Sequence, residues 1–307
     1  MTPAFTFDIA ALLEGVSRKE LEARAARISA AYRGGGTSAS VAGRMDALAY
    51  LVARFPATHA AAHAALRRTE EASPQFYPAS LLDVGAGPGT VALAARAIWP
   101  SLATITLLEP NAIFRGLAEE LWPNANIVAG TLGGALPNAD LVTAGYVLAE
   151  LDLAKIPQIA RELWRAARAM LVLIEPGTPE GFARIRAARQ ALIEEGAHIA
   201  APCTHDKECP MTGGDWCHFS QRLARSRDHM MVKSASVPFE DERYAYLAVS
   251  RAPFARTQAR IIKPPLEHKP AISLLLCDAA GLHIKVVPRR DKEQYRLARK
   301  KGWGDLF

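Results

Sequence analysis

Four cysteines, the only ones in this chain of 307 residues, have a spacing that suits metal binding. Cys203, Cys209 and Cys217 lie in one stretch rich in Pro, Gly and His, separated by five and seven residues, and Cys277 follows after 59 more. Thiolate sulfur is a soft anionic ligand, so four cysteines can close a tetrahedral zinc site or hold a [4Fe–4S] cluster. Structural zinc sites usually use two close cysteine pairs, so this longer spacing favours the cluster. Zinc is the alternative, and four unconnected buried thiols are the third interpretation.

The expected compartment supports metal ligands rather than disulfides. No run of about 18 apolar residues is present, and the chain begins without the basic start and cleavage site of a secretory signal. We therefore expect a cytoplasmic protein without a membrane partner, in which disulfide bonds are disfavoured. His205 and His218 flank the cysteines and could replace one of them, although such a histidine more often forms an ordinary hydrogen bond.

A glycine-rich loop forms a second set of residues that could do chemistry. The segment LLDVGAGPGT stands where an apolar strand would end and a helix begin, the edge at which an open sheet binds ligands. Glycines there allow a tight turn and a close approach of the backbone to a nucleoside. The next apolar run ends in an acidic residue about 20 positions later, which can accept hydrogen bonds from ribose hydroxyls. The candidate cofactor-binding residues are Asp83, Gly85, Ala86, Gly87, Gly89 and Glu109.

The residue types in the loop, more than the spacing of its glycines, indicate which cofactor it binds. Its spacing suits S-adenosylmethionine (SAM) and NAD alike, but DVGAGPG followed by EP resembles class I SAM-dependent methyltransferases more than dehydrogenases. Such enzymes often place residues that meet the methyl group after the fourth strand, here VTAGYVLAELD. Tyr146 is therefore the candidate catalytic residue, and Glu150 is a second that could equally serve in packing and capping. The N/D-P-P-Y/F signature of amino-directed base methylation is absent.

The elements that must position these residues alternate regularly between strand and helix. Apolar runs predict strands at 80–84, 104–108, 126–129, 140–145 and 170–175, and helical patterns lie at 89–98, 111–121, 153–168 and 179–195. This alternation predicts an α/β fold, a doubly wound, Rossmann-like parallel sheet of the class I SAM methyltransferase kind. We expect a helical N-terminal region over 1–77, the SAM-binding domain over 78–198, and a four-cysteine metal-binding and basic C-terminal region with β-structure over 199–307. In that last region, ISLLLCDAAGLHIKVV predicts two strands joined by a short turn.

Positive charge is concentrated near the C-terminus. The formal net charge is +6, and eight Lys and Arg lie between Lys285 and Lys301 with only Asp291 and Glu293 among them. A concentrated basic segment attracts polyanions, so RNA or DNA is an expected partner. A solvated basic helix accounts for the charge equally well.

Taken together, the motifs resemble one family over most of the chain. They include YLVARFPATHAA, LLDVGAGPGT, GYVLAELD, LVLIEPGTPEGFARIRAAR, APCTHDKECPM, DWCHFSQRLARS and RRDKEQYRLARKKGWGD. These segments are similar to the methyltransferase-like proteins associated with the mitochondrial small ribosomal subunit and their bacterial homologues. The resemblance implies a SAM-binding fold, a [4Fe–4S] cluster on Cys203, Cys209, Cys217 and Cys277, and a role in small-subunit assembly through rRNA.

Two functions follow from this resemblance. The first is a SAM-dependent methyltransferase that acts on small-subunit rRNA, with small-subunit ribosomal proteins as further partners. The second is a non-catalytic assembly factor that binds rRNA with the same fold and metal site. The absence of a known catalytic signature after the fourth strand favours the second, whereas the intact glycine loop and Glu109 favour a working cofactor site.

Overall fold

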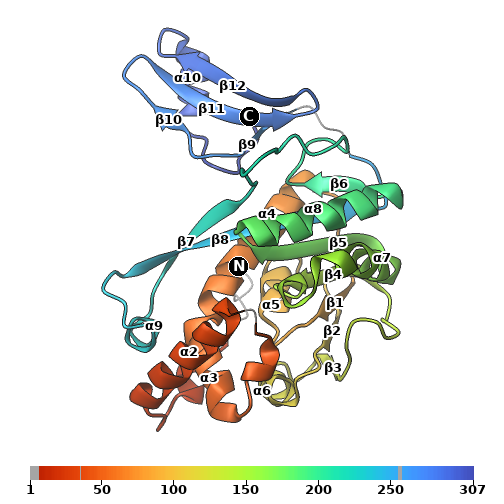
Figure 1. Cartoon of the computed structure of the whole chain (residues 1–307), viewed down its shortest axis with the longest axis vertical. Coiled ribbons are helices and arrows are strands. Elements are labelled where there is room, and N and C mark those ends of the chain that lie inside the picture. The colour runs from red at the N-terminus through yellow and green to blue at the C-terminus, as the bar shows by residue number, and fades with distance from the viewer. Residues whose placement is uncertain (1–6, 35, 255–257) are drawn as a thin grey trace.

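A mixed sheet of eight strands forms the centre of the molecule, as the computed structural model of the chain shows (Figure 1). The structure describes residues 7–34, 36–254 and 258–307, so the first six residues of the expected N-terminal region lie outside it. Along the sheet the order is β3-β2-β1-β4-β5-β8-β6, and β7 pairs with β8. The strands are β1 Ser80–Val84, β2 Thr104–Leu108, β3 Asn126–Val128, β4 Ala139–Gly145, β5 Ala167–Pro176, β6 His198–Ala201, β7 Phe219–Ala224 and β8 Phe239–Ser250.

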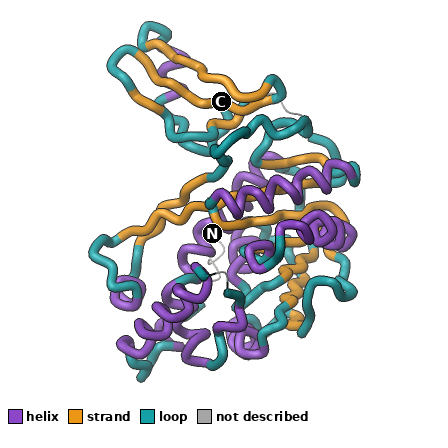
Figure 2. The backbone as a smooth tube through the Cα atoms, in the orientation of Figure 1, coloured by secondary structure: helices purple, strands orange, loops and turns teal. Residues whose placement is uncertain are grey.

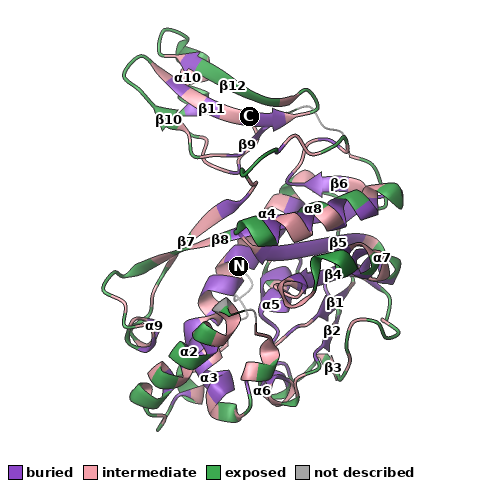
Figure 3. Ribbon diagram, in the orientation of Figure 1, coloured by how far each residue is buried: buried purple, intermediate pink, exposed green. Residues whose placement is uncertain are grey.

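Helices cover both faces of this sheet because successive strand residues point to opposite sides. Leu81 of β1 packs with the first group of helices, and Leu82 packs with the second. The first group contains α3 Arg44–Ala53, α4 Phe55–Ala72, α5 Thr90–Ile98 and α6 Ala112–Leu121. The second contains α7 Ile156–Ala166 and α8 Pro179–Glu194. Figure 3 shows that β1, β4 and β5 are largely buried between these layers.

Helix starts follow the local sequence. Asn111 caps α6 by accepting hydrogen bonds from the N–H groups of Ile113 and Phe114, and Thr178 caps α8 through the N–H of Gly181. The Phe55-Pro56 pair begins α4, since the first turn of a helix tolerates proline. Further helices are α1 Ile9–Leu12, α2 Arg18–Arg33 and α9 Arg227–Val232, with 3₁₀ turns η1 Ser38–Ser40, η2 Leu148–Glu150 and η3 Leu153–Lys155.

A smaller sheet stands at one end of the molecule (Figures 1 and 2). Its order is β10-β11-β12, with β9 paired to β11, and α10 packs against it. The elements are β9 Arg260–Ile261, β10 Leu266–Glu267, β11 Ala271–Asp278, β12 Gly281–Pro288 and α10 Lys292–Ala298. The two strands expected in ISLLLCDAAGLHIKVV are therefore confirmed as the antiparallel pair β11 and β12.

The expected parallel pairing holds for β1 to β5 but not for the strands beyond β5. Strands β1 to β5 are parallel, but β8 runs antiparallel to β5, β6 and β7. Because β8 comes from residues 239–250, the central sheet extends beyond the boundary expected at residue 198. Within the described residues, no helix is both long and apolar enough to cross a membrane.

Candidate functional site

Three of the six predicted cofactor residues, Gly85, Gly87 and Glu109, line a cavity of about 390 Å³ beside the carboxyl ends of β1, β2 and β4. Its lining includes Gly85, Gly87, Glu109, Tyr146 and Glu150. These residues leave three different strands, and parallel strands bring their carboxyl ends to one edge of the sheet. The volume lies within the range typical of small-molecule sites.

The glycine loop is shaped by close packing on both sides and by open space in its middle. Gly85 has a φ of +67°, and a Cβ there would lie 2.4 Å from Cγ2 of Val147. A Cβ at Gly89 would lie 2.2 Å from Nε1 of Trp122, the indole nitrogen that donates to the carbonyl of Pro88. Gly87, at φ +56°, would place a Cβ more than 4 Å from other atoms. A ligand can therefore approach the backbone at Gly87.

Glu109 connects the loop to the cavity. Its side chain is only 3% exposed, and its two carboxylate oxygens accept hydrogen bonds from the N–H groups of Gly87 and Asn111, each at 2.8 Å. Burial raises the pKa of Glu109, and these two hydrogen bonds oppose that shift. The carboxylate thus holds the loop while it lines the cavity.

Asp83, Ala86 and Gly89 are not among the residues described as lining this cavity. Asp83 is fully buried, and its carboxylate accepts hydrogen bonds from Oγ1 of Thr143 at 2.7 Å and from the N–H of Ala92 at 3.1 Å. Burial raises the pKa of Asp83 to about 7, against the effect of these donors. The geometry therefore gives Asp83 a part in joining β1 to β4 and α5.

Tyr146 lines the cavity in a strained backbone conformation, with a φ of +63°. Its hydroxyl donates to Oε1 of Glu242 on β8 at 3.0 Å. Burial raises the pKa of Tyr146 well above its usual range, and the charge of Glu242 adds to that shift while Arg54 opposes it. The phenol therefore remains protonated at neutral pH and is engaged by a carboxylate.

The N-terminal region covers the cavity, which sequence reasoning did not foresee. Glu150 accepts a hydrogen bond from the N–H of Ser38 at 2.9 Å, and the side-chain amide of Asn111 donates to the carbonyls of Ser38 and Val41. Further lining comes from Tyr32, Ser38, Tyr50, Arg54 and Thr58. Only the apolar helical pattern of this region was visible in the sequence, and it does not indicate a cavity.

All four cysteines line a second, smaller cavity of about 40 Å³. Each is a free thiol, and Sγ of Cys277 lies 3.7 Å from Nε2 of His205. Burial, followed by the charge of Cys203, raises the pKa of Cys217 and of Cys277, the latter to about 12. Across residues 7–34, 36–254 and 258–307, no three His, Cys, Asp or Glu side chains are arranged to hold a metal ion as they stand. The fold nevertheless joins three cysteines of one loop with the fourth from β11.

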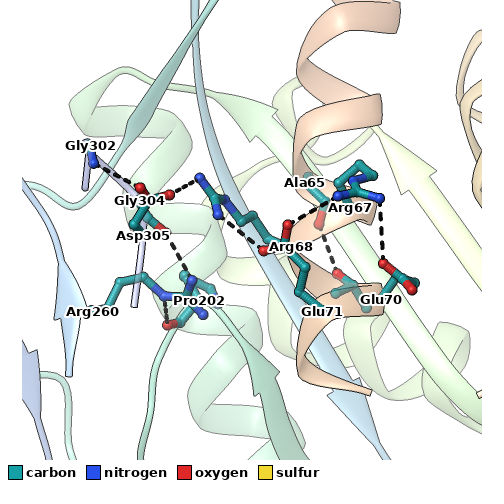
Figure 4. Close-up of polar contacts among 11 residues, drawn as sticks. Ala65, Arg67, Arg68, Glu70, Glu71, Pro202, Arg260, Gly302, Gly304 and Asp305 are labelled. Atoms are coloured by element: carbon teal, nitrogen blue, oxygen red, sulfur yellow. Dashed lines mark hydrogen bonds and ion pairs between the residues drawn. The ribbon is translucent and has the colours of Figure 1, made fainter. Parts of the chain in front are cut away.

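Polar contacts tie the cysteine loop to the C-terminus and to α4 (Figure 4). Arg260 is 3% exposed and donates to the carbonyls of Pro202, at 2.9 Å, and Gly304, at 2.8 Å. Arg68 of α4 forms an ion pair with Asp305, whose other oxygen accepts from the N–H of Gly302 at 2.7 Å. The residue before Cys203 is therefore held by the last turn of the chain.

The aromatic residues around this loop pack against one another. The Trp216 ring stacks on His218 with centroids 5.2 Å apart, and His218 meets Trp303 edge-on at 4.9 Å. Nε1 of Trp216 also donates to the carbonyl of Gly177 at 2.9 Å. These contacts give the rings a structural role at this junction.

Comparison with known proteins shows which family the chain belongs to. Residues 44–307 match the family described as "Mitochondrial small ribosomal subunit Rsm22". The chain belongs to the Rsm22 family. It is 28% identical over 287 residues to the human "Ribosome assembly protein METTL17, mitochondrial", covering 85% of this chain and 62% of that protein. It is also 28% identical over 286 residues to "Rsm22-cox11 tandem protein 2, mitochondrial" of Schizosaccharomyces pombe, covering 74% of this chain and 38% of that protein. This Rsm22-family chain thus spans less than two thirds of the length of these relatives.

Solved structures with some likeness to the chain include methyltransferases. Magnesium protoporphyrin IX methyltransferase from Synechocystis with bound SAM has a TM-score of 0.43 and 13% identity, covering 80% of this chain and 99% of that one. The plantazolicin methyltransferase BpumL has a TM-score of 0.44 and 12% identity, covering 76% and 98%. The strand order observed in this chain, rather than these likenesses, identifies the doubly wound α/β sheet.

Proposed function

We propose that this Rsm22-family protein binds SAM in the cavity at Gly87 and Glu109 and acts as a methyltransferase on small-subunit rRNA during ribosome assembly. The observation that carries the proposal is the meeting of the glycine loop, Glu109 and Tyr146 at one cavity. Membership of the Rsm22 family supports the ribosomal setting.

The residues present fit a nucleoside cofactor. Gly87 leaves open space where a side chain would stand, and Glu109 lies beside it with its carboxylate held by two backbone donors. Glu109 would accept hydrogen bonds from the ribose hydroxyls, and the backbone of the loop would approach the amino-acid part of the cofactor. When bound, SAM supplies a methyl group already activated by its sulfonium. The chain then needs to orient the acceptor and exclude water, which can provide much of the rate.

The residues of the smaller cavity fit a thiolate-bound metal centre. Cys203, Cys209, Cys217 and Cys277 converge from two distant segments, and four sulfur ligands suit a [4Fe–4S] cluster, with zinc as the alternative. Such a centre would supply a structural clamp between the cysteine loop and β11. Its loss should loosen the smaller sheet, because metal binding energy contributes to folding.

Exposed cations supply the proposed RNA-binding surface. Seven of the eight Lys and Arg from Lys285 to Lys301 are exposed, on β12, on α10 and in the turns beside them. Phosphate contacts from such residues position RNA without reading its sequence. The human relative is named as a ribosome assembly protein, so small-subunit ribosomal proteins are further candidate partners. Both relatives are named as mitochondrial. In place of a general cytoplasmic location, this protein would act in the compartment where the small ribosomal subunit is assembled.

A second candidate function is a non-catalytic assembly factor with the same cofactor and metal sites. The contact between Tyr146 and Glu242 favours it, because the hydroxyl of the candidate catalytic residue already donates a hydrogen bond to a carboxylate. Under this proposal, occupancy of the cavity stabilises the N-terminal cover, and the protein serves by binding immature subunits.

The variant Gly87→Asn separates the two functions. Asparagine tolerates the left-handed backbone of Gly87 better than most residues, and its side chain would occupy the loop's open space. A matched control is Gly15→Asn, at φ +70° and with nothing within 4 Å of the added Cβ. The measurements are transfer of labelled methyl groups from SAM to small-subunit rRNA, and co-sedimentation with immature subunits.

If the protein is a methyltransferase, wild type and Gly15→Asn should label the rRNA, whereas Gly87→Asn should not. The Gly87→Asn protein should still sediment with immature subunits. Absence of labelling by folded, SAM-loaded wild-type protein on immature subunits would exclude methyl transfer to them and leave the assembly factor. Failure of wild type to bind SAM at all would contradict the cofactor site itself.

A further inference from the structure

Arg189 on α8 is a buried cation attached to the cysteine loop. It is 4% exposed, and its Nη2 donates to the carbonyls of His205 at 3.1 Å and Lys207 at 2.5 Å. Both carbonyls belong to the segment between Cys203 and Cys209. Its Nε–H is buried without a hydrogen-bond partner. The guanidinium thus shapes this loop while one donor remains unused.

A buried guanidinium is costly unless an anion balances its charge. The described contacts of Arg189 are with neutral carbonyls, not with a carboxylate. Arg189 lines the same small cavity as the four cysteines, and its charge opposes the rise in pKa of both Cys209 and Cys277. An anion in this cavity would therefore satisfy both the charge and the free donor.

A second buried guanidinium approaches the same cysteines from β9. Arg260 stands opposite Cys277 in the pairing of β9 with β11, and it donates to the carbonyl of Pro202, the neighbour of Cys203. Its other hydrogen bond goes to the carbonyl of Gly304. Four thiolates around a zinc ion, or around a cluster core of charge +2, leave two negative charges. Arg189, which lines the cavity, and Arg260, which contacts the residue before Cys203, are buried cations whose combined charge balances these two negative charges. Arg186 also lines the cavity, but it is exposed.

We propose that Arg189 is a positioning residue that donates its Nε–H to a sulfur of the thiolate centre and balances half of its charge. Arg260 balances the other half while it ties the centre to the C-terminal turn. This inference rests on the metal site of the proposed function alone. It requires neither SAM nor rRNA, and it applies to iron and zinc alike.

The test compares Arg189→Gln and Arg189→Lys with wild type in the full chain, purified without oxygen. Arg165→Gln is the control, because it removes the same charge from the exposed surface of the neighbouring helix α7. Metal and labile sulfide per chain are measured first, then the half-time of metal release to a chelator. Thermal unfolding is followed in the loaded protein and after removal of the metal.

We expect Arg189→Gln to release metal at least tenfold faster than wild type and to lower the unfolding midpoint of the loaded protein. After metal removal, its midpoint should equal or exceed that of wild type, because an unbalanced buried charge has gone. Arg189→Lys, which keeps a charge but has a single nitrogen, should lie between them. Arg165→Gln should match wild type in both forms.

Two results would overturn the inference while leaving the metal site intact. One is an unchanged release half-time for Arg189→Gln in a wild type that holds metal. The other is an equal fall of the midpoint with and without metal, which would show that Arg189 acts only through packing and its carbonyl contacts. A wild type that binds no metal would instead contradict the proposed metal centre and this inference together.

Discussion

Replacement of Glu109 by glutamine should weaken SAM binding without unfolding the protein. The carboxylate accepts hydrogen bonds from the N–H groups of Gly87 and Asn111 on separate oxygens, so an amide must turn its NH₂ toward one of these donors or toward the ligand. Hydrogen bonds to a charged group are worth about 1.5–3 kcal/mol. The dissociation constant should therefore rise by about 10- to 150-fold.

Isothermal titration calorimetry with SAM, or with its demethylated product, measures this change. Glu119→Gln is the matched control, since Glu119 is exposed on α6 and outside the cavity lining. Thermal unfolding establishes that both variants remain folded. An unchanged dissociation constant in folded Glu109→Gln protein would refute the assignment of this cavity to a ribose-containing ligand.

Three further changes test other parts of the molecule. Gly85→Ala should lower the free energy of unfolding by about 2–4 kcal/mol, because the φ of Gly85 is +67° and the new Cβ would lie 2.4 Å from a valine methyl. A loss under about 1 kcal/mol in urea unfolding would contradict a rigid loop. Lys300 is exposed, so Lys300→Gln should weaken binding to all RNA sequences alike and reduce the slope of log binding constant against log salt concentration by about 0.7–0.9. A loss of affinity that depends on the RNA sequence would argue against a phosphate contact. Burial raises the pKa of Glu240, but hydrogen bonds from His229 and Lys233 outweigh this effect and lower the pKa to about 2. Because this folded pKa lies below the unfolded value of about 4.3, the carboxylate stabilises the fold above that value by on the order of 3 kcal/mol and loses the effect as the pH falls toward 2. Glu240→Gln should therefore destabilise the protein at pH 7 and much less near pH 2 in denaturant titrations, and a constant difference would refute the assigned shift.

Local patterns in the sequence were sufficient to predict most of the central sheet. The strands at Ser80–Val84 and Thr104–Leu108 and the helix Ala112–Leu121 follow from apolar periodicity. These features depend on neighbouring residues, which is why they can be recognised in one chain. The apolar half of β8, YAYLAVS, carried the same kind of pattern, but its antiparallel place beside β5 depends on long-range pairing.

The candidate cofactor site was predictable only where its residues belong to one strand–loop–helix unit. Gly85, Gly87 and Glu109 fall in such units and reach the cavity as expected. Arg54 and Glu242 could not be found in this way, because their positions near Tyr146 depend on how α4 and β8 pack against the sheet. Asp83 shows the converse, since a residue within the motif is buried by its contacts with Thr143 and Ala92.

The metal centre on the four cysteines is tested by the metal and sulfide content of anaerobically purified wild-type protein, together with its absorption spectrum. We expect about four iron and four labile sulfide per chain and a broad band near 400 nm, as thiolate-bound clusters give. One zinc and no iron would keep the clamp but contradict the cluster. A protein that is folded and metal-free, with the smaller sheet as stable as the rest, would contradict the metal centre on Cys203, Cys209, Cys217 and Cys277.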